Sequence, residues 1–239
     1  LQKGGQTMRQ SGDEQGAIAR WNEVLADYPD SYAAYLALKA LDEAGAATVS
    51  DLQRGLILHG ARQYEDALEA LQRSLGTATA DETARAYYAI GQAQAALGQY
   101  PEAFEAYDVV IRRYTQHELA GDAWMAKAAA EAAYGGDPAG LYYEFYRQYP
   151  DHERAPEALW RAGAALQAEG QWTVAQDYYS ALLSRYPRSS YADEAQFRQG
   201  LGAYASGSWQ AALTSWSAAL PTVSDPASRA RLQVFMGLA

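Results

Sequence analysis

The sequence contains no cysteine, only three lysines among its nineteen cationic residues, and no run of eighteen apolar residues. The missing cysteine excludes disulfides, zinc-thiolate sites and thiol catalysis, but it leaves the redox compartment open. No segment resembles a signal peptide or a membrane-spanning helix. The formal net charge of -10 and the pI near 4.8 argue against nucleic acid as a partner, because phosphate contacts need clustered Lys and Arg.

Motifs for catalysis and metal binding are missing as well. The histidines lie far apart and have no ligand partners at metal spacing: they are His59, His117 and His152. Neither a Walker A loop nor a Gly-x-Ser-x-Gly elbow occurs, and Gly200-x-Gly202 has no preceding strand to make it a dinucleotide fingerprint. Acidic pairs fall at predicted helix starts, where carboxylates favour the helix dipole. We therefore expect no catalytic site, no metal site and no cofactor in this chain.

What the sequence does contain is a glycine that recurs inside helix-forming segments. Gly163 lies in the middle of LWRAGAALQAEGQW, where glycine costs about 1 kcal/mol relative to alanine. The series is Gly5, Gly55, Gly91, Ala126, Gly163, Gly200 and Gly237, with Ala126 in the place of one glycine. The first two members lie 50 residues apart, and each later member follows the one before it by 35 to 37 residues. A constant period of this length indicates a repeat protein.

Each repeat predicts two helices joined by a tight turn. Seven residues after the small residue comes a turn position, which is glycine at Gly12, Gly98, Gly170 and Gly207. Apolar residues spaced by three and four follow, and this spacing places them on one helical face. We expect the glycine in the first helix to let the second helix approach closely, so that packing between the helices outweighs the lost propensity. No segment predicts a strand.

The 50-residue step contains an additional helix, SYAAYLALKALDEAG, which Ser31 can cap and Gly45 can end. The predicted fold is therefore all-α, with about six helix-turn-helix repeats and one inserted helix near the N-terminus. The predicted repeats are 1–30, 50–78, 81–115, 119–150, 156–187 and 191–224, with the extra helix at 31–45 and the start of another repeat at 227–239. Because no polar capping repeat stands at either end, we expect a single domain, 1–239, truncated at both ends.

This pattern resembles the tetratricopeptide repeat, whose members carry small residues at two positions, aromatics between them and a closing proline. The resemblance is most specific in 87–115, 159–187 and 196–224, and it is weakest around Asp137-Pro138, where the turn aromatic is absent. It implies a right-handed α-solenoid whose first helices line an inner groove.

The resemblance also implies which residues line that groove: Leu56, Tyr88, Gln92, Lys127, Trp160, Phe197, Leu201 and Tyr204. These side chains are mostly apolar or aromatic, so they could hold a peptide or stack on sugar rings, or they could merely pack against neighbouring helices. Lys127 is the only cation among them, which argues against a clamp for the carboxylate tail of a chaperone.

The segment LYYEFYRQY leaves the same choice between core and surface open. Tyr142 and Phe145 are in register with the core positions of the other repeats. Tyr143 and Tyr146 are therefore predicted to be surface residues.

The linkers YPDSYAAY and YPRSSYADEA are similar to those of bacterial cell-envelope members of the family. Together with the inserted helix, they resemble the non-catalytic superhelical region of soluble lytic transglycosylases, which cleave peptidoglycan. This resemblance implies an interaction scaffold in the cell envelope or periplasm, with a protein, a peptide or glycan strands as partner. The catalytic Glu-Ser pair and the Gly-Leu-Met-Gln run of that family do not occur, so its active site would lie beyond Ala239. The alternative is a stand-alone envelope adaptor of the outer-membrane assembly or cell-division type.

Overall fold

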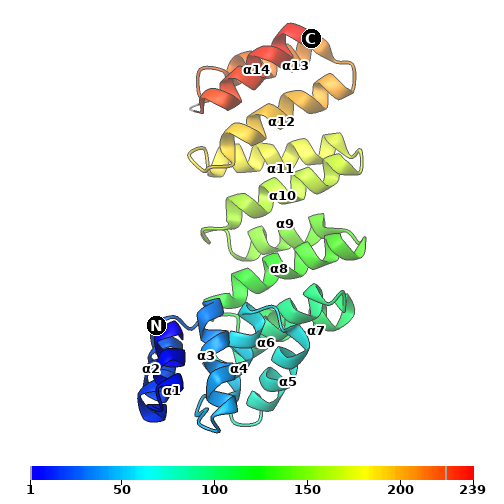
Figure 1. The fold of residues 1–239 in the computed structure, drawn as a ribbon. Helices are drawn as coiled ribbons and strands as arrows, with labels where there is room; N and C mark the ends of the chain where they lie inside the picture. The colour runs from blue at the N-terminus through cyan, green and yellow to red at the C-terminus, as the bar shows by residue number, and fades with distance from the viewer. Residues whose placement is uncertain (1, 224) are drawn as a thin grey trace. The chain divides into compact units, whose positions relative to one another are not determined.

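The computed structural model describes residues 2–223 and 225–239, and the side chains of 4–223 and 225–239. This part of the chain forms fourteen α-helices and no strand, which confirms the predicted all-α fold (Figure 1). The helices are α1 Gln2–Gln10, α2 Glu14–Asp27, α3 Tyr32–Glu43, α4 Asp51–Gly60, α5 Tyr64–Ser74, α6 Ala80–Ala96, α7 Tyr100–Arg113, α8 Leu119–Tyr134, α9 Pro138–Gln148, α10 Ala155–Ala168, α11 Trp172–Arg185, α12 Ala192–Ala205, α13 Trp209–Ala219 and α14 Pro226–Leu238.

The chain divides into two compact parts, which we call unit 1, Leu1–Ala123, and unit 2, Trp124–Ala239. Unit 1 contains the hairpins α1/α2, α4/α5 and α6/α7. The inserted helix α3 packs against α2 and α4, as the sequence predicts. The Ser31 hydroxyl accepts a hydrogen bond from the Ala34 amide at 3.1 Å, and Gly45 follows the helix with a φ of 65°.

Unit 2 contains the hairpins α10/α11 and α12/α13, with α9 packed on α10 and α14 packed on α12 and α13. Buried residues of α8, α9 and α10 form one cluster around Phe145. A second cluster joins α12, α13 and α14 around Trp216, whose side chain is fully buried. Each helix therefore buries its apolar face against its neighbours in the sequence, as in a solenoid of repeats.

Five of the recurring glycines lie where the two helices of a hairpin touch: Gly5, Gly55, Gly91, Gly163 and Gly200. A Cβ atom added to Gly91 would lie 2.6 Å from the ring of Tyr107, and one added to Gly163 would lie 2.6 Å from the ring of Tyr179. Both rings are buried. Only glycine leaves room for such a ring against the first helix, so the predicted close approach of the second helix is confirmed.

The turn glycines have the backbone conformation that their position requires. Gly98 and Gly170 have φ values of 76° and 79°, in the left-handed region that favours glycine at the end of a helix. In the α4/α5 hairpin the same position is Arg62, with a φ of 61°. A residue with a Cβ costs about 1–2 kcal/mol in this region, so this turn is less favourable than the others.

The hairpin α8/α9 differs from the others. Its turn lies at Gly135, and α9 begins after Asp137, eleven residues beyond Ala126, whereas α11 begins after Gln171, eight residues beyond Gly163. Because α8 continues for almost another turn, a different position faces α9. Ala126 is therefore only partly buried, whereas Ala123 and Ala128 of the same helix are fully buried.

Local capping signals mark the starts of several helices. Thr79 and Glu82 form a capping box, in which the Thr79 amide donates to the Glu82 carboxylate at 2.9 Å. Pro101 lies in the first turn of α7, and the Asp225 side chain caps α14 by accepting from the Ser228 amide. Local sequence therefore determines where these helices begin.

Candidate functional site

The eight predicted groove residues all lie on first helices of repeats, but they are divided between the two units. Leu56 of α4 and the pair Tyr88 and Gln92 of α6 belong to unit 1. The other five belong to unit 2, on α8, α10 and α12: Lys127, Trp160, Phe197, Leu201 and Tyr204. In unit 1, Leu56 packs beside the cluster around Leu71, and the Tyr88 ring lies 6.2 Å from that of Tyr107.

Phe197 is a core residue rather than an exposed one, because only 6% of it is accessible. Its ring stacks on Trp216 with centroids 6.1 Å apart, and the Phe235 ring meets it edge-on at 5.1 Å. The Trp216 indole also donates to the Phe197 carbonyl at 2.9 Å. Leu201 and Tyr204 pack beside this cluster and are partly accessible.

Charged residues next to the predicted groove positions form a network that the sequence analysis missed. On α10, Glu157 accepts from Arg154 Nε at 2.9 Å and from Arg161 Nε at 2.7 Å. Burial acts to raise the pKa of Glu157, but the hydrogen bonds from the two arginines outweigh it, so the pKa lies below its ordinary value. Glu157 is therefore ionised at neutral pH and holds two guanidinium groups in place.

A second carboxylate with two arginines lies on the next first helix. Glu194 accepts from Arg198 Nε at 2.7 Å and also from the Arg231 guanidinium of α14. Arg198 Nη1 donates to the Gln167 side chain at 3.0 Å, and the buried Gln167 accepts from the Tyr179 hydroxyl at 3.0 Å as well. The position of Arg198 is thus fixed from both α10 and α12.

The arginines also lie over aromatic rings. The Arg198 guanidinium carbon is 5.6 Å from the centre of the Trp160 ring, and that of Arg231 is 3.9 Å from the centre of the Phe197 ring. Such contacts stabilise a cation by about 0.5–1 kcal/mol at exposed sites and by more where water is excluded. The aromatic rings therefore help the carboxylates to hold these guanidinium groups in place.

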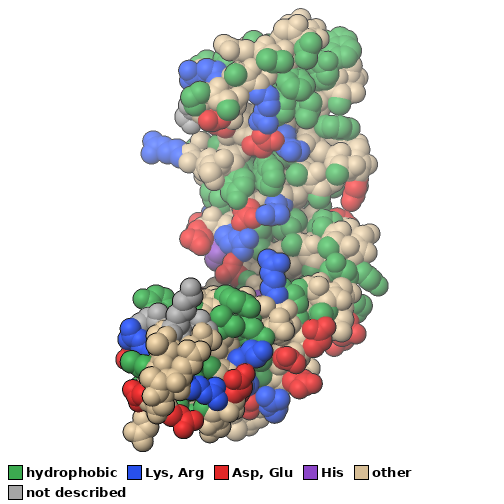
Figure 2. Space-filling view, viewed as in Figure 1, with side chains coloured by type: hydrophobic (Ala, Val, Ile, Leu, Met, Phe, Trp, Pro, Cys, Tyr) green, Lys and Arg blue, Asp and Glu red, His purple; other side chains and the backbone are tan. Residues whose placement is uncertain are grey.

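We call these six residues the Arg–Glu face: Arg154, Glu157, Arg161, Glu194, Arg198 and Arg231. Each carboxylate is shared by two guanidinium groups, so these six side chains together carry a net charge of +2, from four arginines and two glutamates. Figure 2 shows basic and acidic side chains alternating over α10 and α12, with apolar side chains beside them. All four arginine side chains are partly accessible, at 29% for Arg154, 42% for Arg161, 28% for Arg198 and 36% for Arg231.

A signal for this face was present in the sequence. Glu157 and Glu194 are each followed four residues later by an arginine, and this spacing places opposite charges together on a helix surface. The two pairs lie 37 residues apart, which is one repeat period. A periodic Glu-x-x-x-Arg pair could therefore have pointed to a charged face on the first helices.

Unit 1 has the opposite arrangement on its first helices. Arg85 of α6 lies 3.0 Å from the Asp81 carboxylate and 3.6 Å from that of Glu118. The His117 imidazole contacts Asp81 as well, at 3.0 Å. One guanidinium here serves two carboxylates. Unit 1 carries ten Lys and Arg against eighteen Asp and Glu, whereas unit 2 carries nine against eleven.

No group of three His, Asp or Glu residues with the arrangement of a metal site occurs among the residues that the structure describes. In the same part of the chain, no helix combines the length and the apolarity that crossing a bilayer requires.

Comparison with known proteins identifies the class. Models of the tetratricopeptide repeat match residues 1–31, 52–118 and 157–189, which together exceed half of the chain. The chain therefore belongs to the tetratricopeptide-repeat family, as its sequence pattern predicts, and it is a scaffold of the protein-interaction type. No curated protein matches the sequence.

Several solved structures share the fold. YrrB, described as a TPR protein with an unusual peptide-binding site, is 18% identical, with a TM-score of 0.51 over 82% of this chain and 96% of its own. The apo form of RapI is 9% identical, with a TM-score of 0.64 over 99% of this chain and 80% of its own. The apo quorum sensor NprR from B. thuringiensis is 14% identical, with a TM-score of 0.51 over 97% and 66% of the two chains. At these identities the likeness shows the fold alone.

Proposed function

We propose that unit 2 is a peptide-binding module whose Arg–Glu face receives an acidic partner segment. The observation that carries this proposal is that each of Glu157 and Glu194 is shared by two arginines. Arg161 and Arg198 each have five N–H donors, more than the protein oxygens that they contact, and a carboxylate is the group that a guanidinium pairs with best. In a chain with a net charge of -10, such a local excess of positive charge is selective for acidic ligands.

Apolar groups beside the arginines would add to the affinity. Trp160, Leu201 and Tyr204 are each partly accessible on the same helices. An acidic segment with apolar side chains at intervals could therefore pair its carboxylates with Arg161 and Arg198 and bury its apolar groups beside these residues. The peptide-binding site described for YrrB, a protein of the same fold, supports a peptide as the ligand.

The direct test is calorimetric titration with two blocked peptides, one of alternating Asp, Glu and Leu, and one in which Asn and Gln replace the acids. We expect the acidic peptide alone to bind, and to bind more weakly as salt rises from about 50 to about 500 mM, because salt screens exposed charges. Equal binding of the two peptides, or binding that does not depend on salt, would contradict the proposal.

The finer assignment rests on the sequence resemblance. We propose that the chain is part of a lytic transglycosylase-like protein that acts on peptidoglycan in the bacterial envelope or periplasm. The Tyr-Pro-x-Ser linkers and the inserted helix α3 support this assignment. The alternative is a stand-alone envelope adaptor for protein partners. Sequencing the reading frame downstream of Ala239 separates them, because a catalytic domain there favours the enzyme and a stop codon favours the adaptor. A pull-down with purified glycan strands tests the peptidoglycan partner.

A further inference from the structure

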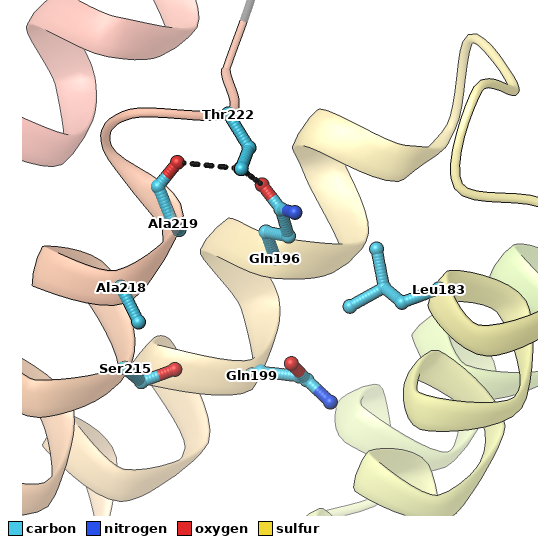
Figure 3. A pocket seen from close by; sticks show the side chains of 7 residues that line it. All are labelled: Leu183, Gln196, Gln199, Ser215, Ala218, Ala219 and Thr222. Carbon is cyan, nitrogen blue, oxygen red and sulfur yellow. Dashed lines mark hydrogen bonds between the residues drawn. The ribbon is translucent and has the colours of Figure 1, made fainter.

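A polar pocket lies between the second helices of unit 2, away from the Arg–Glu face. It has a volume of about 230 Å³, and Figure 3 shows its lining: Leu183 from α11, Gln196 and Gln199 from α12, Ser215, Ala218 and Ala219 from α13, and Thr222 beyond it. A neighbouring pocket shares Gln199 and Ser215 and extends the hollow to Gln176, Ala203 and Ala211. Together the two form a groove that follows α13 from Ala211 to Ala219, which is about 12 Å of helix.

Hydrogen bonds hold the two glutamines that form the floor of this groove. The Thr222 hydroxyl shares its one proton between the Ala219 carbonyl at 2.8 Å and Gln196 Oε1 at 3.1 Å, and the Gln196 NH₂ group is directed toward the pocket (Figure 3). The Gln199 NH₂ group donates to the Ser180 hydroxyl at 2.8 Å, so its carbonyl oxygen remains as an acceptor. With the Ser215 hydroxyl, the groove therefore presents an amide donor, an amide acceptor and a hydroxyl that can act as either.

In the preceding repeat, two tyrosines occupy the equivalent place. Tyr143 of α9 and Tyr178 of α11 pack edge to face with their ring centres 4.9 Å apart. One period of 37 residues later, the same positions are Ser180 and Ser215. Tyr143 is 36% accessible, in agreement with its predicted place on the surface. The exchange of two rings for two hydroxyls is what opens the space between α11 and α13.

We infer that this groove is a second binding site, for the main chain of an uncharged extended peptide. No lining residue is charged, in a chain where 20% of residues are, so nothing in the groove favours a charged ligand. Each peptide unit offers one N–H and one C=O, which match the amide acceptor and donor of the floor. The lining has no aromatic ring on which a sugar face could stack. The length admits about three to four extended residues at about 3.3 Å each.

The test is an NMR titration of the ¹⁵N-labelled chain with the blocked peptide Ac-Ala-Ser-Ala-Ser-Ala-NH₂. We expect saturable shifts of the side-chain amide signals of Gln196 and Gln199, independent of salt. The double variant S180Y/S215Y restores the tyrosine pair of the preceding repeat and should weaken this binding at least about tenfold. The matched control S184Y/S217Y adds two tyrosines at exposed serines of the same helices, outside the lining, and should bind as the unaltered chain does.

The single variant Gln196→Ala keeps the test valid if the tyrosine pair disturbs folding, and it should also weaken binding. Equal affinity of S180Y/S215Y and S184Y/S217Y would overturn the inference, as would shifts confined to other residues. If chitotetraose moves the two glutamine signals and the peptide does not, the ligand class is wrong. S180Y/S215Y should still bind the acidic peptide, so a failure of this site is distinguishable from a failure of the Arg–Glu face.

Discussion

Arg85 in unit 1 lies between two carboxylates, whereas Glu194 in unit 2 lies between two guanidinium groups. Both residues occupy first helices of the same kind of repeat. The helical hairpins are built alike in the two units, with a glycine facing a large buried side chain at Gly91 and Gly163. The comparison shows that packing positions maintain the repeat, while the exposed positions of the first helix are free to change the sign of the surface charge.

This difference predicts that the two units have different ligands. Unit 1 has a net charge of -8 and unit 2 one of -2, from the residues of each unit. An acidic segment should therefore bind unit 2 in preference to unit 1, because unit 2 has the smaller negative charge and because it carries the paired arginines.

The largest expected effect concerns the aromatic residues at the predicted groove positions. Phe197 of unit 2 is buried against Trp216, whereas Tyr88 of unit 1 is partly accessible. Phe197→Ala should lower the free energy of unfolding by about 3–5 kcal/mol, because it removes a buried ring and leaves a cavity. Tyr88→Ala should cost clearly less. Urea denaturation measures both, and equal losses would mean that Phe197 is not part of the core.

Charge reversal on the Arg–Glu face should have the next largest effect. The double variant R161E/R198E places two new carboxylates beside Glu157 and Glu194, so it should weaken binding of the acidic peptide at least about a hundredfold, since like charges cost several kcal/mol. Calorimetry measures the change. The matched control R147E/R185E reverses two accessible arginines on the second helices α9 and α11, and it should change the affinity only about two- to threefold. A similar loss in both variants would show that net charge alone is responsible.

The smallest expected effect is the dependence of stability on the protonation of Glu157. Its pKa is lowered in the folded chain, so the stability that it contributes is present above the pKa of the unfolded chain and is lost as the pH falls through the lower folded value. The difference in unfolding free energy between the unaltered chain and Glu157→Gln should therefore shrink as the pH falls from about 6 to about 3. Urea titrations at several pH values measure it. A difference that does not vary with pH would contradict the assignment of Glu157 as the charged centre of two arginines.

Periodicity and local signals were sufficient to predict the fold. The glycine series gave the hairpins, and Ser31 and Gly45 gave the inserted helix, because both kinds of signal act within one repeat. The α8/α9 hairpin was predicted less well. Its total length matches the others, so the sequence does not reveal that α8 continues further before its turn at Gly135.

The candidate site was harder to predict because burial depends on neighbouring helices. Phe197 occupies a groove position of the family, yet Phe235 of α14 packs on it and Arg231 covers its ring. In the same way, the partners of Arg198 come from two helices. Glu194 lies on α12 with it, whereas Gln167 lies on α10, 31 residues earlier in the sequence. A pattern of Glu and Arg at a spacing of four indicates a salt bridge, but it does not indicate that a third residue will join it.

An NMR titration of the full chain with the acidic peptide would show directly which unit binds it, by following the Trp160 indole N–H and the Nε–H signals of Arg85, Arg161 and Arg198. We expect saturable shifts at Trp160, Arg161 and Arg198, with the Arg85 signal unchanged. Shifts at Arg85 without shifts at Arg161 and Arg198 would contradict the assignment of acidic-ligand binding to unit 2.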